Sequence, residues 1–240
     1  MQLDEKWAFV GKKQKHCNPD DPADWFCGDQ WDHVALDPDS RLVLEVVVGP
    51  RTQDSAELLL EGVRDRLGGR VPELVCSDEY PVYAEVLLSV FGQEQVPPRT
   101  GRPGRPAGPR RVLPEELCYA TVHKTKEQGR VTAVEAQAVF GELGAGERVS
   151  TSYLERHNAT DRHRNARKGR KTYRFSKDWE VHEAMTCFTM FNYNFCWPVR
   201  TLRQGDRDAG YTPRTPAMVA GLTDHVWSLE EWLTFPAVQR

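Results

Sequence analysis

The sequence predicts an α/β fold whose sheet begins antiparallel and continues parallel. Three strand-like segments follow one another before any helical pattern occurs. A helix, a short apolar strand and a second helix come next, which is the alternation typical of parallel strand connections. With 240 residues, 39% of them hydrophobic, the chain is long enough for one large domain, or for one domain with an appendage.

The first three strands are predicted to form an antiparallel meander. Residues 3–10 alternate in polarity and are rich in aromatic and branched side chains. Residues 16–31, rich in Asp and Pro, are expected to form a hairpin loop before a second strand at about 32–36. The turn 37–40 leads into a third strand at 41–48, whose Leu and Val residues indicate burial on both faces.

The parallel part of the sheet is predicted to begin after a helix. This helix extends from the capping residue Thr52 to about Leu67, because apolar residues recur at helical spacing and two glycines follow. Residues 73–77 form a short apolar strand that leads to Asp78, and a second helix is expected over 82–91.

The second half of the chain is predicted to start with a long basic loop. Residues 93–114 contain few apolar residues and many Pro, Gly and Arg residues, a composition typical of an extended loop. We then expect two paired strands, a helix opened by Thr151, a long helix initiated at Ser176 and a short terminal helix. Their ranges are about 117–124, 129–139, 151–167, 177–195 and 228–233.

The net charge of −3 conceals an uneven distribution of charge along the chain. The net charge is −10 over residues 1–98, +9 over 99–174 and −2 over 175–240. A cationic middle beside an acidic first third is expected when a basic surface meets phosphates, although a basic loop beside a solvated helix face would give the same pattern.

No window of the sequence approaches 18 uncharged apolar residues, which argues against a membrane partner. The six scattered cysteines favour reduced thiols.

Three carboxylates stand out by their position. Asp4 lies inside the first predicted strand, where a carboxylate is costly unless it is paired or bound to a cation. Asp78 follows a strand at the end where open α/β sheets place ligands, and Glu155 lies in the first turns of a helix. Oxygen ligands from two strands and a helix would suit hard divalent cations such as Mg²⁺, while surface or capping roles are the alternative.

Five segments, in order along the chain, resemble transposases of the insertion-sequence-one type. They include the segment that begins at Asp4, the Asp78-Glu79-Tyr80-Pro81-Val82-Tyr83 run and the Glu155-Arg156-His157-Asn158 helix. The matching ranges are 4–13, 78–83, 153–158, 170–178 and 193–196. The likeness extends over nearly the whole chain, from Asp4 to the tail at 215–218.

The resemblance implies a catalytic domain of the DDE superfamily with a ribonuclease-H-like, or retroviral-integrase-like, fold: a mixed sheet with helices on both faces. It implies that Asp4, Asp78 and Glu155 are the catalytic acids and bind two Mg²⁺ or Mn²⁺ ions. The implied activity is cleavage of DNA at transposon 3′ ends and strand transfer into target DNA. The implied partners are double-stranded DNA and a second copy of the chain, with which it would form a synaptic homodimer. The implied location is the bacterial cytoplasm, in association with the nucleoid.

Several cations are predicted to contact the DNA backbone. The insertion over about 93–149 contributes Arg110 and Arg111. The nineteen residues 156–174 carry eight cations and one acid, and there the prediction selects Arg156, Arg164, Arg167, Lys168, Arg170 and Lys171. His157 and Asn158 are expected to orient the scissile phosphate or to hydrogen-bond Glu155.

The resemblance is incomplete, which leaves other hypotheses open. The interval from Asp78 to Glu155 is longer than in compact family members. The expected organisation is a single catalytic domain over 1–240 with a tail at about 200–240, and no zinc-finger or helix-turn-helix module is expected before Asp4. A separately encoded DNA-recognition subunit would supply that function. The alternatives are an inactive remnant that binds DNA or a partner subunit, and a stand-alone ribonuclease-H-like nuclease. A zinc site at His16, Cys17, Cys27 and His33 is disfavoured because the spacing matches no common finger.

Overall fold

The computed structural model describes residues 1–97, 108–144, 148–169, 171–208 and 210–235. Its centre is a six-stranded mixed sheet with the strand order β3-β2-β1-β4-β7-β8. The strands are β1 Gln2–Val10, β2 Gly28–Leu36, β3 Val43–Gly49, β4 Leu74–Ser77, β7 Cys118–Glu127 and β8 Arg130–Phe140. Strands β1, β2 and β3 form an antiparallel meander, and β4 runs parallel to both β1 and β7. The predicted α/β class, with an antiparallel start and a parallel continuation, is confirmed.

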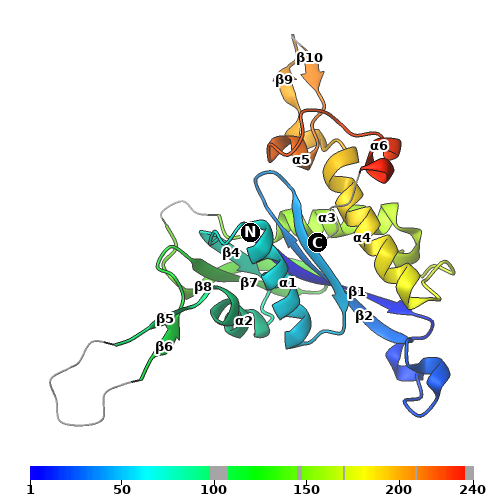
Figure 1. The fold of residues 1–240 in the computed structure, drawn as a ribbon, viewed down its shortest axis with the longest axis horizontal. Coiled ribbons are helices and arrows are strands. Elements are labelled where there is room, and N and C mark those ends of the chain that lie inside the picture. Colours follow the sequence, from blue (N-terminus) through cyan, green and yellow to red (C-terminus); the bar gives the residue numbers. More distant parts are fainter. Residues whose placement is uncertain (98–107, 145–147, 170, 209, 236–240) are drawn as a thin grey trace.

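Helices cover both faces of this sheet (Figure 1). On one face lie α1 and α2, and on the other α3 and α4; their bounds are Gln53–Arg66, Val82–Phe91, Ser152–Arg164 and Trp179–Cys196. Strand alternation divides the apolar side chains of β2 between the two cores: Ala35 packs under α1 and α2, whereas Val34 and Leu36 pack under α3 and α4.

The same alternation determines which side chains of β1 meet α3. Leu3 is fully buried in the core beneath α1 and α2. Asp4 and Lys6 share the opposite face, where both bond side chains of α3. Two charged groups of β1 are therefore directed at one helix.

Two helix boundaries differ from the prediction. Helix α4 begins at Trp179, because the Asp178 side chain accepts a hydrogen bond from the Val181 N–H at 2.8 Å and so provides the N-cap expected of Ser176. Helix α3 ends at Arg164, and the extended backbone of Asn165 separates it from a 3-10 turn at Ala166–Lys168.

Smaller elements extend from the central body. Strands β5 (Gln93–Gln95) and β6 (Arg110–Val112) pair at the base of the insertion that was predicted to be a loop, while Arg99, Arg102 and Arg105 lie outside the described residues. The hairpin β9–β10 and helices α5 and α6 lie beyond the end of α4 (Figure 1). Their bounds are Gln204–Asp206, Gly210–Thr212, Pro216–Val219 and Leu229–Thr234, and further 3-10 turns are Gln14–His16, Pro22–Asp24 and Arg200–Leu202. Among the described helices, none combines the length and the apolar character that crossing a bilayer requires.

Candidate active site

The three predicted acids come from neighbouring elements of the fold. In the parallel pair β1–β4, Leu3 lies opposite Ser77. The residues that follow these two in the sequence are the acids Asp4 and Asp78. The charge of Asp78 contributes to the raised pKa of Asp4, as expected of two carboxylates that lie near each other. Glu155 lies on α3, which packs against β1. Strand register and helix packing thus bring the acids to the same end of β4.

Asp4 is held by hydrogen bonds to both of its carboxylate oxygens. Oδ1 accepts from the Glu5 backbone N–H at 2.9 Å, and Oδ2 accepts from Nδ2 of Asn158 on α3 at 2.7 Å. Burial, followed by the charges of Glu5 and Asp78, raises the pKa of Asp4 to about 6. Asn158 therefore hydrogen-bonds Asp4, whereas Glu155 was the partner that the sequence predicted.

Asp78 and Glu155 share two polar partners, Lys124 and Thr151. The Lys124 ammonium, from β7, lies 3.3 Å from Oδ1 of Asp78 and also contacts Oε1 of Glu155. The Thr151 hydroxyl lies 3.2 Å from the same Asp78 oxygen and 3.0 Å from the same Glu155 oxygen. Lys124 also donates to the Thr151 hydroxyl at 3.1 Å, which closes the network.

Lys124 and Thr151 were missed as site residues in the sequence. Thr151 was assigned only as the residue that opens α3, yet its side chain makes no capping hydrogen bond to that helix. Thr151 is buried, with 2% of the residue exposed, and its hydroxyl contacts the two carboxylates instead. A capping residue whose hydroxyl bonds elsewhere is a signal of function, but only the structure reveals it.

His157 does not belong to the acid group. Its side chain is buried in the core beneath α3 and α4, with Nε2 3.0 Å from the sulfur of Met190 and the ring against Tyr193. Burial lowers its pKa to about 4, so the imidazole is neutral at pH 7. The predicted role in orienting the phosphate or Glu155 is therefore wrong for His157, because helical geometry turns it away from Glu155.

A second group of charges lies fully inside the protein, further along β1. Lys6 contacts Asp161 of α3 and lies 3.2 Å from Asp32 of β2, and Lys168 also contacts Asp32. We call these four residues the buried ion cluster; it carries two positive and two negative charges. Although burial alone would raise it, the ammonium groups of Lys168 and Lys6 lower the pKa of Asp32 to about 2. The prediction that Lys168 contacts DNA is therefore wrong, since its ammonium is inside the fold.

The other predicted DNA contacts differ in exposure. Those on the surface are Arg110, Arg111, Arg156 and Lys171. Arg164 is only partly exposed, donates to the Asn192 side chain at 2.7 Å and lies over the Trp197 ring. Arg170 lies outside the described residues.

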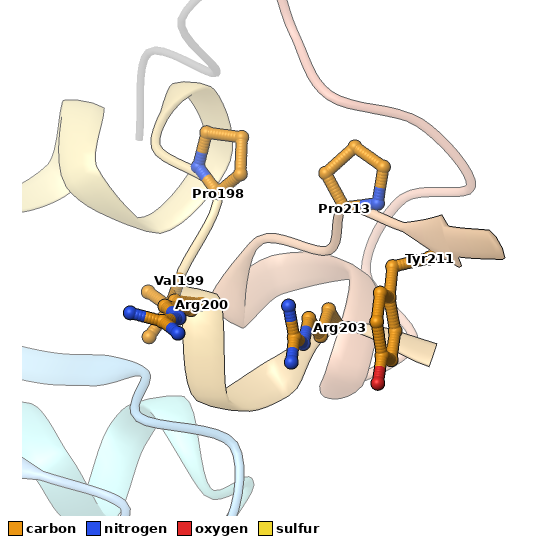
Figure 2. Close-up of a pocket in the computed structure, with 6 residues that line it drawn as sticks. All are labelled: Pro198, Val199, Arg200, Arg203, Tyr211 and Pro213. Atoms are coloured by element: carbon orange, nitrogen blue, oxygen red, sulfur yellow. The ribbon is translucent and has the colours of Figure 1, made fainter. Parts of the chain in front are cut away.

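Two surface hollows lie away from the acids. One lies between the end of α4 and the β9–β10 hairpin, where the Arg203 guanidinium is 3.6 Å from the centre of the Tyr211 ring (Figure 2). Its other lining residues are Pro198, Val199, Arg200 and Pro213. The second hollow is lined by residues of 166–181, including the partly exposed Arg167 and the Tyr173 side chain, which is 96% exposed.

No ready-made metal site is found within the part of the chain that the structure describes, where no three His, Cys, Asp or Glu side chains are grouped to hold an ion. At the acids, the Lys124 ammonium stands between Asp78 and Glu155. Of the residues considered for zinc, His33 is buried in β2 with Nε2 3.0 Å from the carbonyl oxygen of Pro50, and Cys17 and Cys27 are free thiols. The disfavoured zinc site at these residues and His16 gains no support.

The sequence matches no protein-family model, and no curated protein is detectably similar to it.

Proposed function

We propose that this chain is the catalytic domain of a DNA transposase with a ribonuclease-H-like fold, which cleaves DNA at transposon 3′ ends and transfers the strand to target DNA. One observation carries the proposal: Asp4 and Asp78 follow directly on paired residues of two parallel strands, and a shared network joins Asp78 to Glu155 of α3. The sheet order, in which an antiparallel meander precedes strands parallel to β1, supports the fold assignment.

The chemistry of the acid group suits hard divalent cations. All three side chains offer carboxylate oxygens, the ligands that Mg²⁺ and Mn²⁺ prefer. Among the ion pairs of the described residues, the Lys124 ammonium already occupies a position between Asp78 and Glu155, where a cation is attracted. The buried Oδ1 of Asn158, beside Asp4, has no hydrogen-bond partner among the described residues. Two ions held by Asp4, Asp78 and Glu155 would stabilise the charge on the attacking and leaving oxygens of a phosphodiester.

The remaining residues of the site would position these carboxylates. Asn158 donates a hydrogen bond to one oxygen of Asp4, and the Thr151 hydroxyl lies within hydrogen-bond distance of one oxygen each of Asp78 and Glu155. The side chains are thereby oriented before DNA arrives, which lowers the cost of reaching the reactive geometry.

Double-stranded DNA is the proposed substrate. The exposed cations Arg156, Lys171, Arg110 and Arg111 would contact the phosphate backbone with little base specificity. Recognition of transposon ends by a separately encoded subunit, synapsis by a homodimer and a place at the bacterial nucleoid complete the proposal.

The test is incubation of the purified protein with Mn²⁺ and labelled DNA that carries candidate terminal repeats. The proposal predicts both nicked 3′ ends and joined strand-transfer products. Hydrolysis without joining would contradict it and indicate a stand-alone nuclease. Binding without either product would contradict it and indicate an inactive remnant.

A further inference from the structure

Lys124 is the only ammonium among the described residues that contacts both Asp78 and Glu155. It extends from β7, the strand that pairs with β4 on the side opposite β1. Its side chain is 22% exposed, whereas those of Asp78 and Glu155 are 51% and 46% exposed. The ammonium is therefore the inner partner, and the two carboxylates form the solvent side of the contact.

Several polar partners fix the position of the Lys124 ammonium. Thr151, from the start of α3, accepts from the ammonium at 3.1 Å while its hydroxyl is also within hydrogen-bond distance of both acids. The Lys124 ammonium, from β7, and the Thr151 hydroxyl, from the start of α3, converge on the same oxygens of the two acids. A solvated surface lysine would instead have its ammonium free to sample many positions.

We propose that Lys124 is an internal counter-ion that holds Asp78 and Glu155 together when no metal is bound and that a divalent cation must displace from their oxygens. The proposal rests on the proposed metal-dependent function. Two like carboxylates repel at short range, and a monovalent ammonium reduces that repulsion. A divalent ion competes for the same oxygens and repels the ammonium, so the two cations exclude each other there.

This exclusion has a measurable consequence. Without the ammonium, a divalent ion no longer has to displace Lys124 from the oxygens of Asp78 and Glu155. Binding of Mg²⁺ to the Lys124→Met variant should therefore be tighter than to wild type, by about ten-fold for a partly solvated charge. Lys124→Arg keeps the charge and should show no such gain.

Isothermal calorimetry with Mg²⁺ alone and with Mn²⁺ alone, on the full chain and without DNA, measures this directly. The matched control is Lys12→Met, which removes a lysine that pairs with Asp24 in the loop after β1 and should leave metal affinity unchanged. Thermal melting gives a second readout: the metal-free Lys124→Met variant should melt below wild type, and saturating Mg²⁺ should raise its melting temperature more than that of wild type.

The outcomes separate this proposal from the proposed function. If wild type binds metal, Asp78→Asn abolishes binding and Lys124→Met binds equally or more weakly, the counter-ion proposal is overturned and the metal site stands. If wild type binds no divalent ion, or if Asp78→Asn leaves binding intact, the proposed metal site and the counter-ion proposal both fail. Tighter binding by Lys124→Met but not by Lys124→Arg supports the exchange.

Discussion

The face of β1 that α3 covers carries two groups of charges with opposite properties. The buried ion cluster around Lys6 has two ammonium groups, two carboxylates and almost no exposed surface. The acid group around Asp4, two residues earlier on the same strand, has three carboxylates and one ammonium, and its edge faces solvent.

The difference lies in charge balance and exposure. A buried and balanced cluster can accept no further ion, because every charge already has a partner and burial makes any excess costly. An exposed group with excess negative charge attracts cations and leaves room for a substrate. The comparison therefore indicates a structural role for the buried ion cluster, and it supports the proposed catalytic role of the acids.

The largest expected effect is a loss of stability when the buried ion cluster is disrupted. Lys168→Met should lower the free energy of unfolding by about 3–5 kcal/mol, because it leaves Asp32 inside the protein with one cation fewer. Urea denaturation measures this change. Lys171→Met, a nearby exposed lysine, is the control and should stay within about 0.5 kcal/mol of wild type. A Lys168→Met protein that stays stable but loses DNA affinity would reverse the assignment of Lys168.

The next effect is a loss of stability in acid. His182, on α4, is buried like His157, and its Nδ1 lies 2.7 Å from the Ser176 hydroxyl. Burial lowers the pKa of both histidines to about 4, so between that value and 6.5 the unfolded chain binds protons that the folded chain excludes. The free energy of unfolding should fall as pH decreases through this window, by about 2 kcal/mol for each histidine.

His157→Leu should reduce the slope of this stability profile and leave the rate of DNA cleavage unchanged, since the ring lies in the core beneath α4. Urea denaturation across the pH range and a cleavage assay provide the two measurements. A cleavage rate that falls while the stability is preserved would show that His157 has a role in the active site.

A smaller effect of opposite sign is expected at Asp4. Its pKa is raised from 3.8 to about 6, so the folded state loses stability as pH rises through that interval. Asp4→Asn should thus stabilise the protein at pH 7 by about 1 kcal/mol, after allowance for one lost hydrogen bond, while it abolishes cleavage. Asp32→Asn, in the balanced cluster, should instead destabilise it. If thermal melting shows that both substitutions change the stability in the same direction, the distinction between the acid group and the buried ion cluster is lost.

The smallest effects are expected at the exposed cations. Arg156→Ala and Lys171→Ala should each change stability by less than about 0.5 kcal/mol. Each should reduce the slope of log affinity for DNA against log salt by about one, as loss of one phosphate contact would. Fluorescence anisotropy at several salt concentrations is the measurement, and an unchanged slope for both variants would exclude this surface from the DNA interface.

Much of the fold could be predicted from periodicity, because the strands of the meander and helices α1 and α2 bury regular apolar patterns. Asp4 and Asp78 could be proposed as site residues because their positions relative to the strands are local features of the sequence. Lys124 and Thr151 were not, because their role depends on β7 and α3 meeting at the end of β4. Lys168 was misread for a related reason: a basic run does not reveal which cation finds a buried partner such as Asp32.

The most direct test of the central claim is DNA cleavage by single variants of the acid group. Asp4→Asn, Asp78→Asn and Glu155→Gln should each abolish nicking in Mg²⁺ or Mn²⁺ while DNA binding and folding persist. Asp65→Asn, which changes an exposed acid of α1, should cleave at the wild-type rate. Metal-dependent nicking that survives all three changes would show that these carboxylates are not the catalytic centre.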